Sequence, residues 1–337
     1  MKRALTVVLA SLLIIPSIAP GAPTSAPDRR LSPGEVSAFP SFVQRVEPAI
    51  VGLRVHNAEN AASSARLGSR RFGSAVIFDA RGYALTVSYL LLDAVEVEAR
   101  SRDGRAVPAQ VVGFDLDTGL GVVKLTGDGP WPVATLGDSR AVAAGARTGT
   151  VGVDEDNDLV QVTGTVNAVR RFSAYWEYML DRAIISNAPN PGYGGGGLFT
   201  TNGRLAGTVS LNLNEISRSS LAIPTDFYRN HRDEMMRYGR VVSRPRRAWL
   251  GVFAQVIEEG VVVAGVVPDG PGDRGGLQEG DVIVSLNAEE VGSRRDFYTS
   301  LWRHEPGDAL TFEVMREKKM RRLEVKGGDR AHFYRQL

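Results

Sequence analysis

Short runs of β-branched and apolar residues, separated by glycine-containing turns, constrain the fold of this chain more than any other feature. The runs AIVGLRV, GSAVIF and YALTVSYLL follow one another from Ala49 onward, and residues 79–82 and 103–104 provide turn signals between strands. Many short strands at regular spacing predict antiparallel barrels or a sandwich. The first helical pattern comes late, at residues 226–238, and we expect Thr225 to be its N-cap.

A second block of strands follows a basic, proline-interrupted joint. The joint is VVSRPRR at residues 241–247, and a length of 337 residues suits two domains. Residues 248–328 contain strand patterns at both ends and one helical stretch, SRRDFYTSLWRH, at 293–304. A compact α+β module is therefore predicted after the joint.

Charge and residue usage exclude several classes of function. Lys and Arg number 40 against 38 Asp and Glu, and the first 21 residues hold two of the bases and no acid, so the remainder is balanced. No nucleic-acid partner is expected, because duplex binding needs a basic excess. The absence of Cys excludes thiol nucleophiles and disulfides, and four scattered histidines argue against a metal centre. We expect neither a metal nor a cofactor.

The N-terminus has the three-part pattern of a secretory signal. Lys2 and Arg3 precede an apolar run from Ala4 to about residue 15, and Pro16 and small residues near position 21 close it. An uncleaved anchor is the alternative, but about a dozen apolar residues are fewer than the ~20 that span a bilayer. Residues 1–21 are thus predicted to be a signal peptide and 22–38 a flexible leader. A location across the inner membrane, in the periplasm, follows.

The order and spacing of several motifs resemble the HtrA (Deg-type) trypsin-like serine proteases. The motifs are GSAVIFDARGYALT, VVGFDLDTGLGVVKL, LGDS at 136–139, VTGTVNAV at 162–169, NPGYGGGGL at 190–198 and LAIPTD at 221–226. The block WLGV with VVPDGPGDRGGLQEGDVIVSLN looks like the PDZ domain that these proteins carry. The resemblance implies a mostly β fold: a chymotrypsin-like double β-barrel at 39–240, the linker 241–247, and a small α+β PDZ domain at 248–328.

The same resemblance leaves the catalytic positions without catalytic side chains. Tyr89 takes the place of the family His in LTVSYL, Gly119 that of the Asp in TGLGVVK, and Gly194 that of the Ser in NPGYGGGGL. Glycine has no side chain that can attack, and a tyrosine with a pKa of about 10 is a weak general base at neutral pH. An oxyanion-hole remnant at the amides of Gly192 and Gly194 is expected to give little acceleration alone. We therefore expect a pseudoprotease that is not an enzyme.

Relocated catalytic groups are the alternative to this interpretation. Ser88 and Ser186 are the candidate nucleophiles, although Ser88 points away from Tyr89 in an alternating strand. Three of the histidines also have ordinary explanations: a strand terminus for His56, a basic helix for His231, and a helix C-terminus for His304.

The glycine run at 194–197 does not predict a phosphate site. It lacks the Lys and Ser/Thr that follow a phosphate-binding loop. We interpret it as a loop left flexible without a nucleophile. A further hypothesis is that Tyr89 and Tyr193 together plug the old cleft, because both are bulkier than the family residues at these positions.

The second domain is predicted to retain its peptide-binding parts. PDZ modules bind an extended peptide along a strand edge and hold its terminal carboxylate in a loop of amides. By resemblance, the expected peptide-binding residues are Trp249, Leu250, Gly251 and Val252 in the loop, Phe253, Ala254 and Gln255 in the pairing strand, and Phe297 and Leu301 on the facing helix. Core packing is the alternative for Phe297 and Leu301, whose spacing is i, i+4. Groove lining by Tyr298 or Trp302 stays open.

The expected function is a scaffold, chaperone or regulator that binds peptide tails or unfolded proteins in the cell envelope. An active serine endopeptidase with relocated residues and an inactive regulatory subunit of an active HtrA hetero-oligomer are the alternatives. Family members commonly trimerise through aromatic residues near the start of the protease domain, and Phe39 and Phe42 occupy such a stretch beside Pro40. A homotrimer is one prediction for them, and packing on the first strand is the other.

Overall fold

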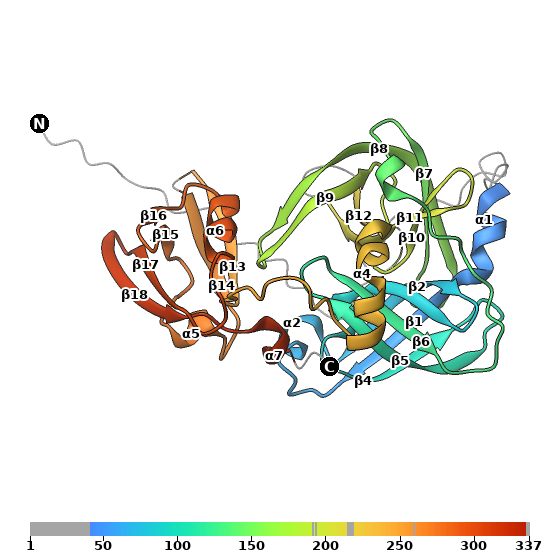
Figure 1. Ribbon diagram of the computed structural model, residues 1–337, viewed down its shortest axis with the longest axis horizontal. Helices are drawn as coiled ribbons and strands as arrows, with labels where there is room; N and C mark the ends of the chain where they lie inside the picture. Colours follow the sequence, from blue (N-terminus) through green and yellow to red (C-terminus); the bar gives the residue numbers. More distant parts are fainter. Residues whose placement is uncertain (1–40, 191, 193, 214–218, 259, 335–337) are drawn as a thin grey trace, which may run out of the picture.

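Two closed six-stranded barrels and a separate open sheet form the architecture of the chain (Figure 1). The computed structural model describes residues 41–190, 192, 194–213, 219–258 and 260–334. The predicted signal peptide, leader, Phe39 and Pro40 lie outside these residues, as do Tyr193 and Pro191.

The first barrel has the strand order β1-β2-β3-β6-β5-β4, with every neighbouring pair antiparallel. Its strands are β1 (Ile50–Asn57), β2 (Arg70–Asp79), β3 (Tyr83–Val87), β4 (Ala94–Arg100), β5 (Ala106–Asp115) and β6 (Leu120–Leu125). The predicted turn at 79–82 is confirmed, since Gly82 has φ +96° and its N–H donates to the Asp79 carbonyl at 2.8 Å. Short helices η1 (Glu47–Ala49), α2 (Ser64–Leu67) and α3 (Ser88–Leu91) flank this barrel, and α1 (Ser41–Val46) precedes η1.

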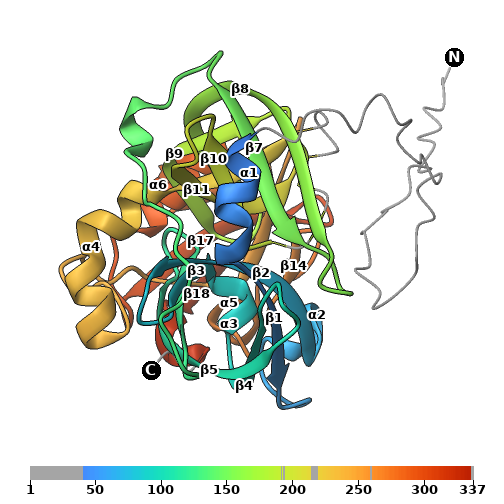
Figure 2. The ribbon, with the colours of Figure 1, turned by 90° about the vertical axis from the view of Figure 1, so that its right-hand side faces the viewer.

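The second barrel has the order β10-β11-β12-β9-β8-β7. Its elements are η2 (Ser139–Ala141), β7 (Arg147–Val153), β8 (Leu159–Ala174), β9 (Tyr178–Ser186), β10 (Gly197–Thr200), β11 (Leu205–Asn212), β12 (Ser220–Pro224) and α4 (Thr225–Tyr238). One buried apolar cluster contains residues of both barrels, so the two pack as one body. Figure 2 shows α1 lying beside this body and α4 on its outer side.

The start of α4 differs from the sequence-based prediction. The helix begins at Thr225, and Pro224 is the N-cap residue. The Thr225 hydroxyl donates to the carbonyls of Gly137 at 3.3 Å and Ala206 at 3.2 Å. Thr225 therefore does not cap the helix, because its buried hydroxyl is used to tie the first turn to the barrel.

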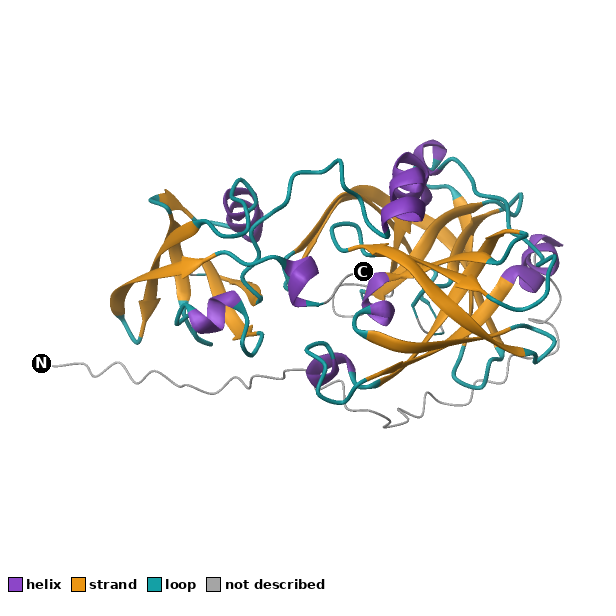
Figure 3. Ribbon diagram, turned by 60° about the horizontal axis from the view of Figure 1, so that its bottom comes forward, coloured by secondary structure: helices purple, strands orange, loops and turns teal. Residues whose placement is uncertain are grey.

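The open sheet has the order β13-β14-β15-β17-β18, with β16 beside β15. Its domain contains β13 (Val252–Ile257), β14 (Gly260–Val266), α5 (Pro271–Arg274), β15 (Val282–Leu286), β16 (Glu289–Glu290), α6 (Arg294–Leu301), β17 (Ala309–Arg316), β18 (Lys319–Lys326) and α7 (Arg330–Phe333). The predicted joint at 241–247 falls in the segment between α4 and β13, where no helix or strand is assigned. Strands predominate over helices in both bodies (Figure 3).

Phe42 packs within the chain. Its side chain is 2% exposed, and its ring lies so close to Gly149 on β7 that a Cβ there would be 2.8 Å from a ring carbon. This contact holds α1 on the second barrel, in line with the packing alternative for Phe42. The homotrimer remains a prediction.

The end of α4 is fitted to β5 by a glycine on each side. A Cβ at Gly113 would overlap backbone atoms of Gly239, whose carbonyl accepts the Phe114 N–H at 3.0 Å. We expect Gly113→Ala to lower the free energy of unfolding of the barrel domain by about 1–3 kcal/mol, because the backbone must move apart. Chemical denaturation measures this. Gly292→Ala is the control, since its Cβ would have no neighbour nearer than 3.7 Å; equal stability of the two variants would contradict the prediction.

Candidate functional site

Tyr89 fills the space beside Gly194. These two residues occupy two of the three positions predicted for the triad. Tyr89 lies on α3 after β3, and its hydroxyl donates to the Ser210 carbonyl at 3.1 Å. A Cβ at position 194 would overlap the Tyr89 hydroxyl oxygen. Burial raises the pKa of this phenol above its ordinary value of 10. Tyr89 thus occupies the volume that a side chain at 194 would need, and it stays protonated at neutral pH.

The loop around Gly194 is held by backbone contacts. The Gly194 carbonyl accepts the Ser74 N–H at 2.8 Å, and the Gly195 N–H donates to the Val209 carbonyl at 2.8 Å. The Gly192 N–H points to Oδ1 of Asn190 at 3.4 Å. Gly195 has φ +99°, which favours glycine there. Of the predicted oxyanion-hole glycines, Gly194 therefore lies on a formed turn, and the amide of Gly192 faces an asparagine side chain.

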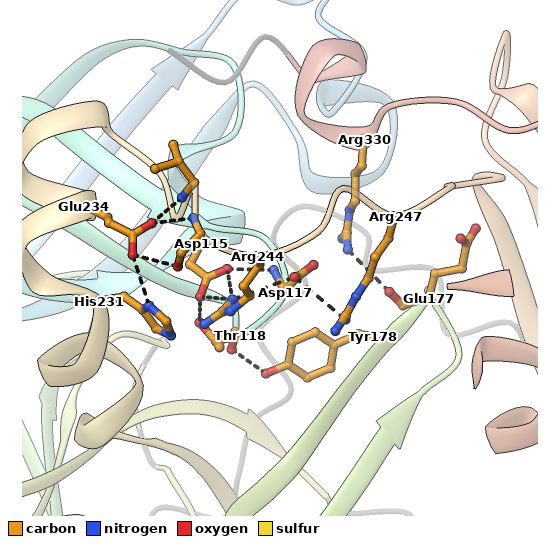
Figure 4. Close-up of polar contacts among 12 residues, drawn as sticks. Asp115, Asp117, Thr118, Glu177, Tyr178, His231, Glu234, Arg244, Arg247 and Arg330 are labelled. Atoms are coloured by element: carbon orange, nitrogen blue, oxygen red, sulfur yellow. Dashed lines mark hydrogen bonds and ion pairs between the residues drawn. The ribbon is translucent and has the colours of Figure 1, made fainter. Parts of the chain in front are cut away.

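Gly119, the third predicted position, lies in a loop that the linker clamps. It has φ +81°, and its carbonyl accepts the Ser88 N–H at 2.7 Å. Nearby, Asp115 accepts from Arg244 at 2.8 and 2.7 Å and from the Thr118 hydroxyl at 2.7 Å (Figure 4). The carboxylate next to this position is thus used for joining the linker to the barrel, and it has no histidine partner among the described contacts.

The alternative nucleophiles and bases lie in structural contacts. The Ser186 hydroxyl bonds to the Thr165 carbonyl at 3.1 Å, and Ser88 is 6% exposed. His231 faces Glu234 at 3.6 Å, as Figure 4 shows, and His304 lies beside Asn287 at 3.0 Å. His56 lies on β1 opposite Glu96. Across the described residues, the structure therefore pairs no histidine with either candidate serine.

The predicted amide loop of the second domain binds a carboxylate within the same chain. Oε1 of Glu177 accepts the Val252 N–H at 2.9 Å, and Oε2 accepts the Leu250 N–H at 3.1 Å. Gly251, between them, has φ +75°, which turns successive amides toward one point. The loop Leu250–Gly251–Val252 is therefore shaped to hold a carboxylate group.

The strand after the loop also binds a backbone group. The Ala254 N–H on β13 donates to the Tyr175 carbonyl at 2.6 Å, and the Phe253 ring lies 5.9 Å from that of Tyr175. Gln255 follows on the same strand and is exposed. The predicted pairing strand thus contacts the turn between β8 and β9.

The facing helix contributes different residues from those expected. Phe297 and Leu301 are fully buried in the core of the second domain, as the packing alternative held. Tyr298 instead points to the β8–β9 turn, where its hydroxyl donates to the Ala174 carbonyl at 2.7 Å. Trp249 packs on the rings of Phe333 and Tyr334, with centroids 4.8 and 5.6 Å away.

Glu177 and Arg294 are site residues that the sequence alone does not predict. The only local signal for Glu177 as a site residue is that an acidic residue directly follows two aromatic residues, in SAYWEY, within a strand-rich region. Arg294 donates from Nε to the Ala254 carbonyl at 2.8 Å. No pattern within either segment shows that the two lie together, because their partners are far away in the chain.

Comparisons with known proteins agree with this two-part structure. A family model described as a trypsin-like peptidase domain matches residues 73–207, and one described as a PDZ domain matches residues 248–326. A "Probable periplasmic serine endoprotease DegP-like" of Halomonas elongata is 30% identical over 281 residues, covering 77% of this chain and 57% of that protein. The chain thus spans just over half the length of the DegP-like relatives it matches first.

A shorter relative matches almost end to end. The "Serine endoprotease DegS" of Escherichia coli (strain K12) is 26% identical over 332 residues, covering 93% of this chain and 92% of that protein. Two solved structures named "HtrA-type protease AlgW", one with a tripeptide and one with a decapeptide, are 28% and 27% identical. Each covers 87% of this chain, with TM-scores of 0.52 and 0.51 and with 97% and 99% of the solved chain matched. The predicted fold class is confirmed.

These names correct one sequence-based prediction. The expectation that the protein is not an enzyme is contradicted, because the relatives matched are named serine endoproteases. Periplasmic is part of the DegP-like name, which agrees with the predicted compartment at the level of the relatives. None of the described helices is both long and apolar enough to cross a membrane.

The contact between Tyr89 and position 194 predicts a non-additive pair of substitutions. Gly194→Ala should lower the free energy of unfolding by about 1–3 kcal/mol, because the new methyl overlaps the phenol oxygen. Tyr89→Phe removes that oxygen and one hydrogen bond, at a cost of about 0.5–1.5 kcal/mol. We expect the double variant to be more stable than the sum of the two effects by about 1 kcal/mol or more.

Denaturant unfolding of the four proteins measures this coupling. Combining Tyr89→Phe with Gly292→Ala is the matched control, which should be additive because a Cβ at Gly292 would have no neighbour nearer than 3.7 Å and the site lies in the other domain. Additive effects at 89 and 194 would contradict the proposed fit of these two residues.

Proposed function

Because this chain belongs to the HtrA family of trypsin-like serine proteases with a PDZ domain, we propose that it binds polypeptides through their C-terminal carboxylates. The amide loop Leu250–Gly251–Val252 receives the carboxylate, and β13 pairs with the preceding residues. Binding of chain ends in this way holds unfolded proteins, or proteins with accessible C-terminal tails, in the cell envelope, as a scaffold or chaperone does.

The observation that carries this proposal is the carboxylate already bound in the loop. The amides of Leu250 and Val252 both donate to the carboxylate of Glu177, at 2.9 to 3.3 Å. Hydrogen bonds to an ionised group are stronger than those between neutral groups, so such a loop selects a carboxylate over an amide. The Ala254 N–H adds a strand-type contact two residues further on. The names of the AlgW structures, which contain peptides, support polypeptide as the ligand class.

We place the protein in the periplasm. The support is the predicted signal peptide at residues 1–21 and the name of the DegP-like relatives. The same proposal includes two kinds of assembly, a hetero-oligomer with active relatives and a homotrimer. Both rest on family membership alone.

The names of the relatives favour hydrolysis of polypeptides as a second candidate function. Position 89 has a phenol side chain, and positions 119 and 194 are glycines. A serine-type nucleophile in this chain therefore has to come from another residue. Ser88 and Ser186 are the candidates retained from the sequence.

Binding of a labelled peptide tests the first function. The octapeptide RRFSAYWV, which copies residues 170–176 and ends in valine, should bind the full chain at pH 8 at least about tenfold more tightly as the free acid than as the C-terminal amide. Gly251→Ala should weaken binding by about tenfold or more, because its backbone has φ +75° and a Cβ would lie 3.0 Å from the Trp249 ring.

Fluorescence anisotropy measures these affinities. Gly276→Ala is the matched control, since Gly276 also has a positive φ, +83°, but a Cβ there would meet nothing within 4 Å. Equal affinities for the acid and the amide would show that the loop does not capture chain ends.

Proteolysis requires a separate experiment with unfolded casein. For an enzyme that uses a serine hydroxyl, a fluorophosphonate reagent labels one serine, and the corresponding variant, Ser88→Ala or Ser186→Ala, loses both labelling and cleavage. Mass spectrometry identifies the fragments and the labelled residue. With no fragments and no label, polypeptide binding alone would describe the protein.

A further inference from the structure

The turn between β8 and β9 lies in the peptide groove of the PDZ domain. These strands continue beyond the second barrel as a two-stranded ribbon that reaches the open sheet (Figure 1). At its end, Glu177 is 2% exposed, and its carboxylate lies on the amides of Leu250 and Val252. A segment of the barrel domain, 73 residues before the loop, therefore fills the position of a bound carboxylate.

The residues before Glu177, from the end of β8 into the turn, also lie in the groove. The carbonyl of Tyr175 accepts the Ala254 N–H from β13 at 2.6 Å. On the opposite side, α6 provides Arg294, whose Nη1 donates to the Ser173 carbonyl at 3.1 Å. The Tyr298 hydroxyl donates to the Ala174 carbonyl and accepts the Glu177 N–H at 2.9 Å. The turn is thus held between a strand and a helix, as a peptide ligand of this domain type is.

We propose that residues 175–177 are an internal ligand that occupies the PDZ groove, with the Glu177 carboxylate in place of a C-terminal carboxylate, so that an outside chain end binds only when the turn withdraws. The proposal rests on the proposed function, because it assigns a competitor to the same loop. The outside ligand is an extended peptide with a free C-terminus, and its carboxylate and the carbonyl two residues earlier take the contacts of Glu177 and Tyr175.

The backbone of the turn determines where the Glu177 side chain lies. Ala174 pairs with Tyr178, so residues 175–177 form a three-residue hairpin loop. Glu177 has φ +53°, the left-handed conformation that the last residue of such a loop adopts. The hairpin itself therefore holds Glu177 in the conformation in which its carboxylate reaches the amide loop.

The buried carboxylate also makes the contact sensitive to pH. Burial raises the pKa of Glu177 from 4.5 to about 7, against smaller opposite effects of the amides of Val252 and Leu250 and the charge of Arg330. Arg330 on α7 donates to the Glu177 carbonyl at 3.4 Å, and Tyr298 and Tyr334 are the titratable phenols facing the group. On the facing helix, Arg294 is a charged residue that contacts the same ribbon, through the Ser173 carbonyl.

The direction of the pH effect follows from where the proton binds more tightly. The docked turn binds a proton more tightly than the free turn, so docking is strongest below pH 4.5 and weakens as the pH rises to about 7. The C-terminal carboxylate of a free peptide has a pKa near 3.5, lower than that of a glutamate, so in the same buried loop it stays ionised to a lower pH than Glu177 does. Binding of such a peptide should therefore strengthen between pH 5.5 and pH 8.

Hydrogen exchange of the loop amides tests the internal contact without any added peptide. In the full chain, Glu177→Ala should make the amides of Leu250 and Val252 exchange about tenfold faster or more, because their acceptor is gone. Asp181→Ala is the matched control on the same ribbon, since the Asp181 side chain is 81% exposed and pairs with Arg171, away from the groove. Glu177→Gln retains an acceptor oxygen and the shape of the side chain, so it should keep the amides protected.

Peptide binding then tests the competition. RRFSAYWV as the free acid should bind Glu177→Ala about tenfold more tightly than the native chain at pH 5.5. Native affinity should rise several-fold from pH 5.5 to 8, whereas that of Glu177→Gln should not change with pH. Amides equally protected in the native chain and Glu177→Ala, or equal affinities of the two, would overturn the internal ligand. Faster exchange in Glu177→Ala without binding of the peptide to either protein would support the internal contact and overturn the proposed capture of chain ends.

Discussion

Closure of each six-stranded sheet into a barrel is the constraint on which the rest of this structure depends. A closed sheet leaves no free edge, so strands that are longer than the barrel must continue outside it. The strand β8 has 16 residues, and its last pairs with β9, such as Ala174 with Tyr178, form a ribbon of two strands alone. Such a ribbon is marginal in water without further packing. The groove between β13 and α6 supplies that packing.

The barrels also bring together the three predicted triad positions, which hold one phenol and two glycines. Tyr89, Gly119 and Gly194 come from α3, the β5–β6 loop and the turn before β10. The carbonyls of Gly119 and Gly194 accept the N–H groups of Ser88 and Ser74, and the phenol of Tyr89 fills the space at Gly194. The arrangement keeps the geometry of a trypsin-like domain, while its polar interactions join parts of the chain to one another. Chemistry at this site, as the names of the relatives imply, would depend on other groups.

Charged side chains from the linker connect the two bodies. Arg244 binds Asp115, and Arg247 lies 3.7 Å from Asp117 (Figure 4). Glu234 on α4 accepts the Val242 N–H and the Ser243 hydroxyl, and these contacts lower its pKa to about 2. The linker is therefore fastened to the first barrel and to α4 on its way to the PDZ domain. Arg246 in the linker pairs with Asp329, and the next residue, Arg330, donates to the Glu177 carbonyl at 3.4 Å. The linker and the ribbon thus both contact the segment around α7.

The sequence by itself determined the features that repeat or lie close together in the chain. The alternation of strands and glycine turns predicted the barrels, the order of the motifs predicted the family, and WLGV predicted the amide loop, because each depends on neighbours within a few residues. Tertiary structure alone decided that Glu177 lies in that loop and that the hydroxyl of Tyr89 bonds to Ser210, 121 positions later. It also decided that Phe297 and Leu301 belong to the core and Tyr298 to the groove. These outcomes depend on which distant segments meet when the sheets close, and no local pattern encodes that meeting.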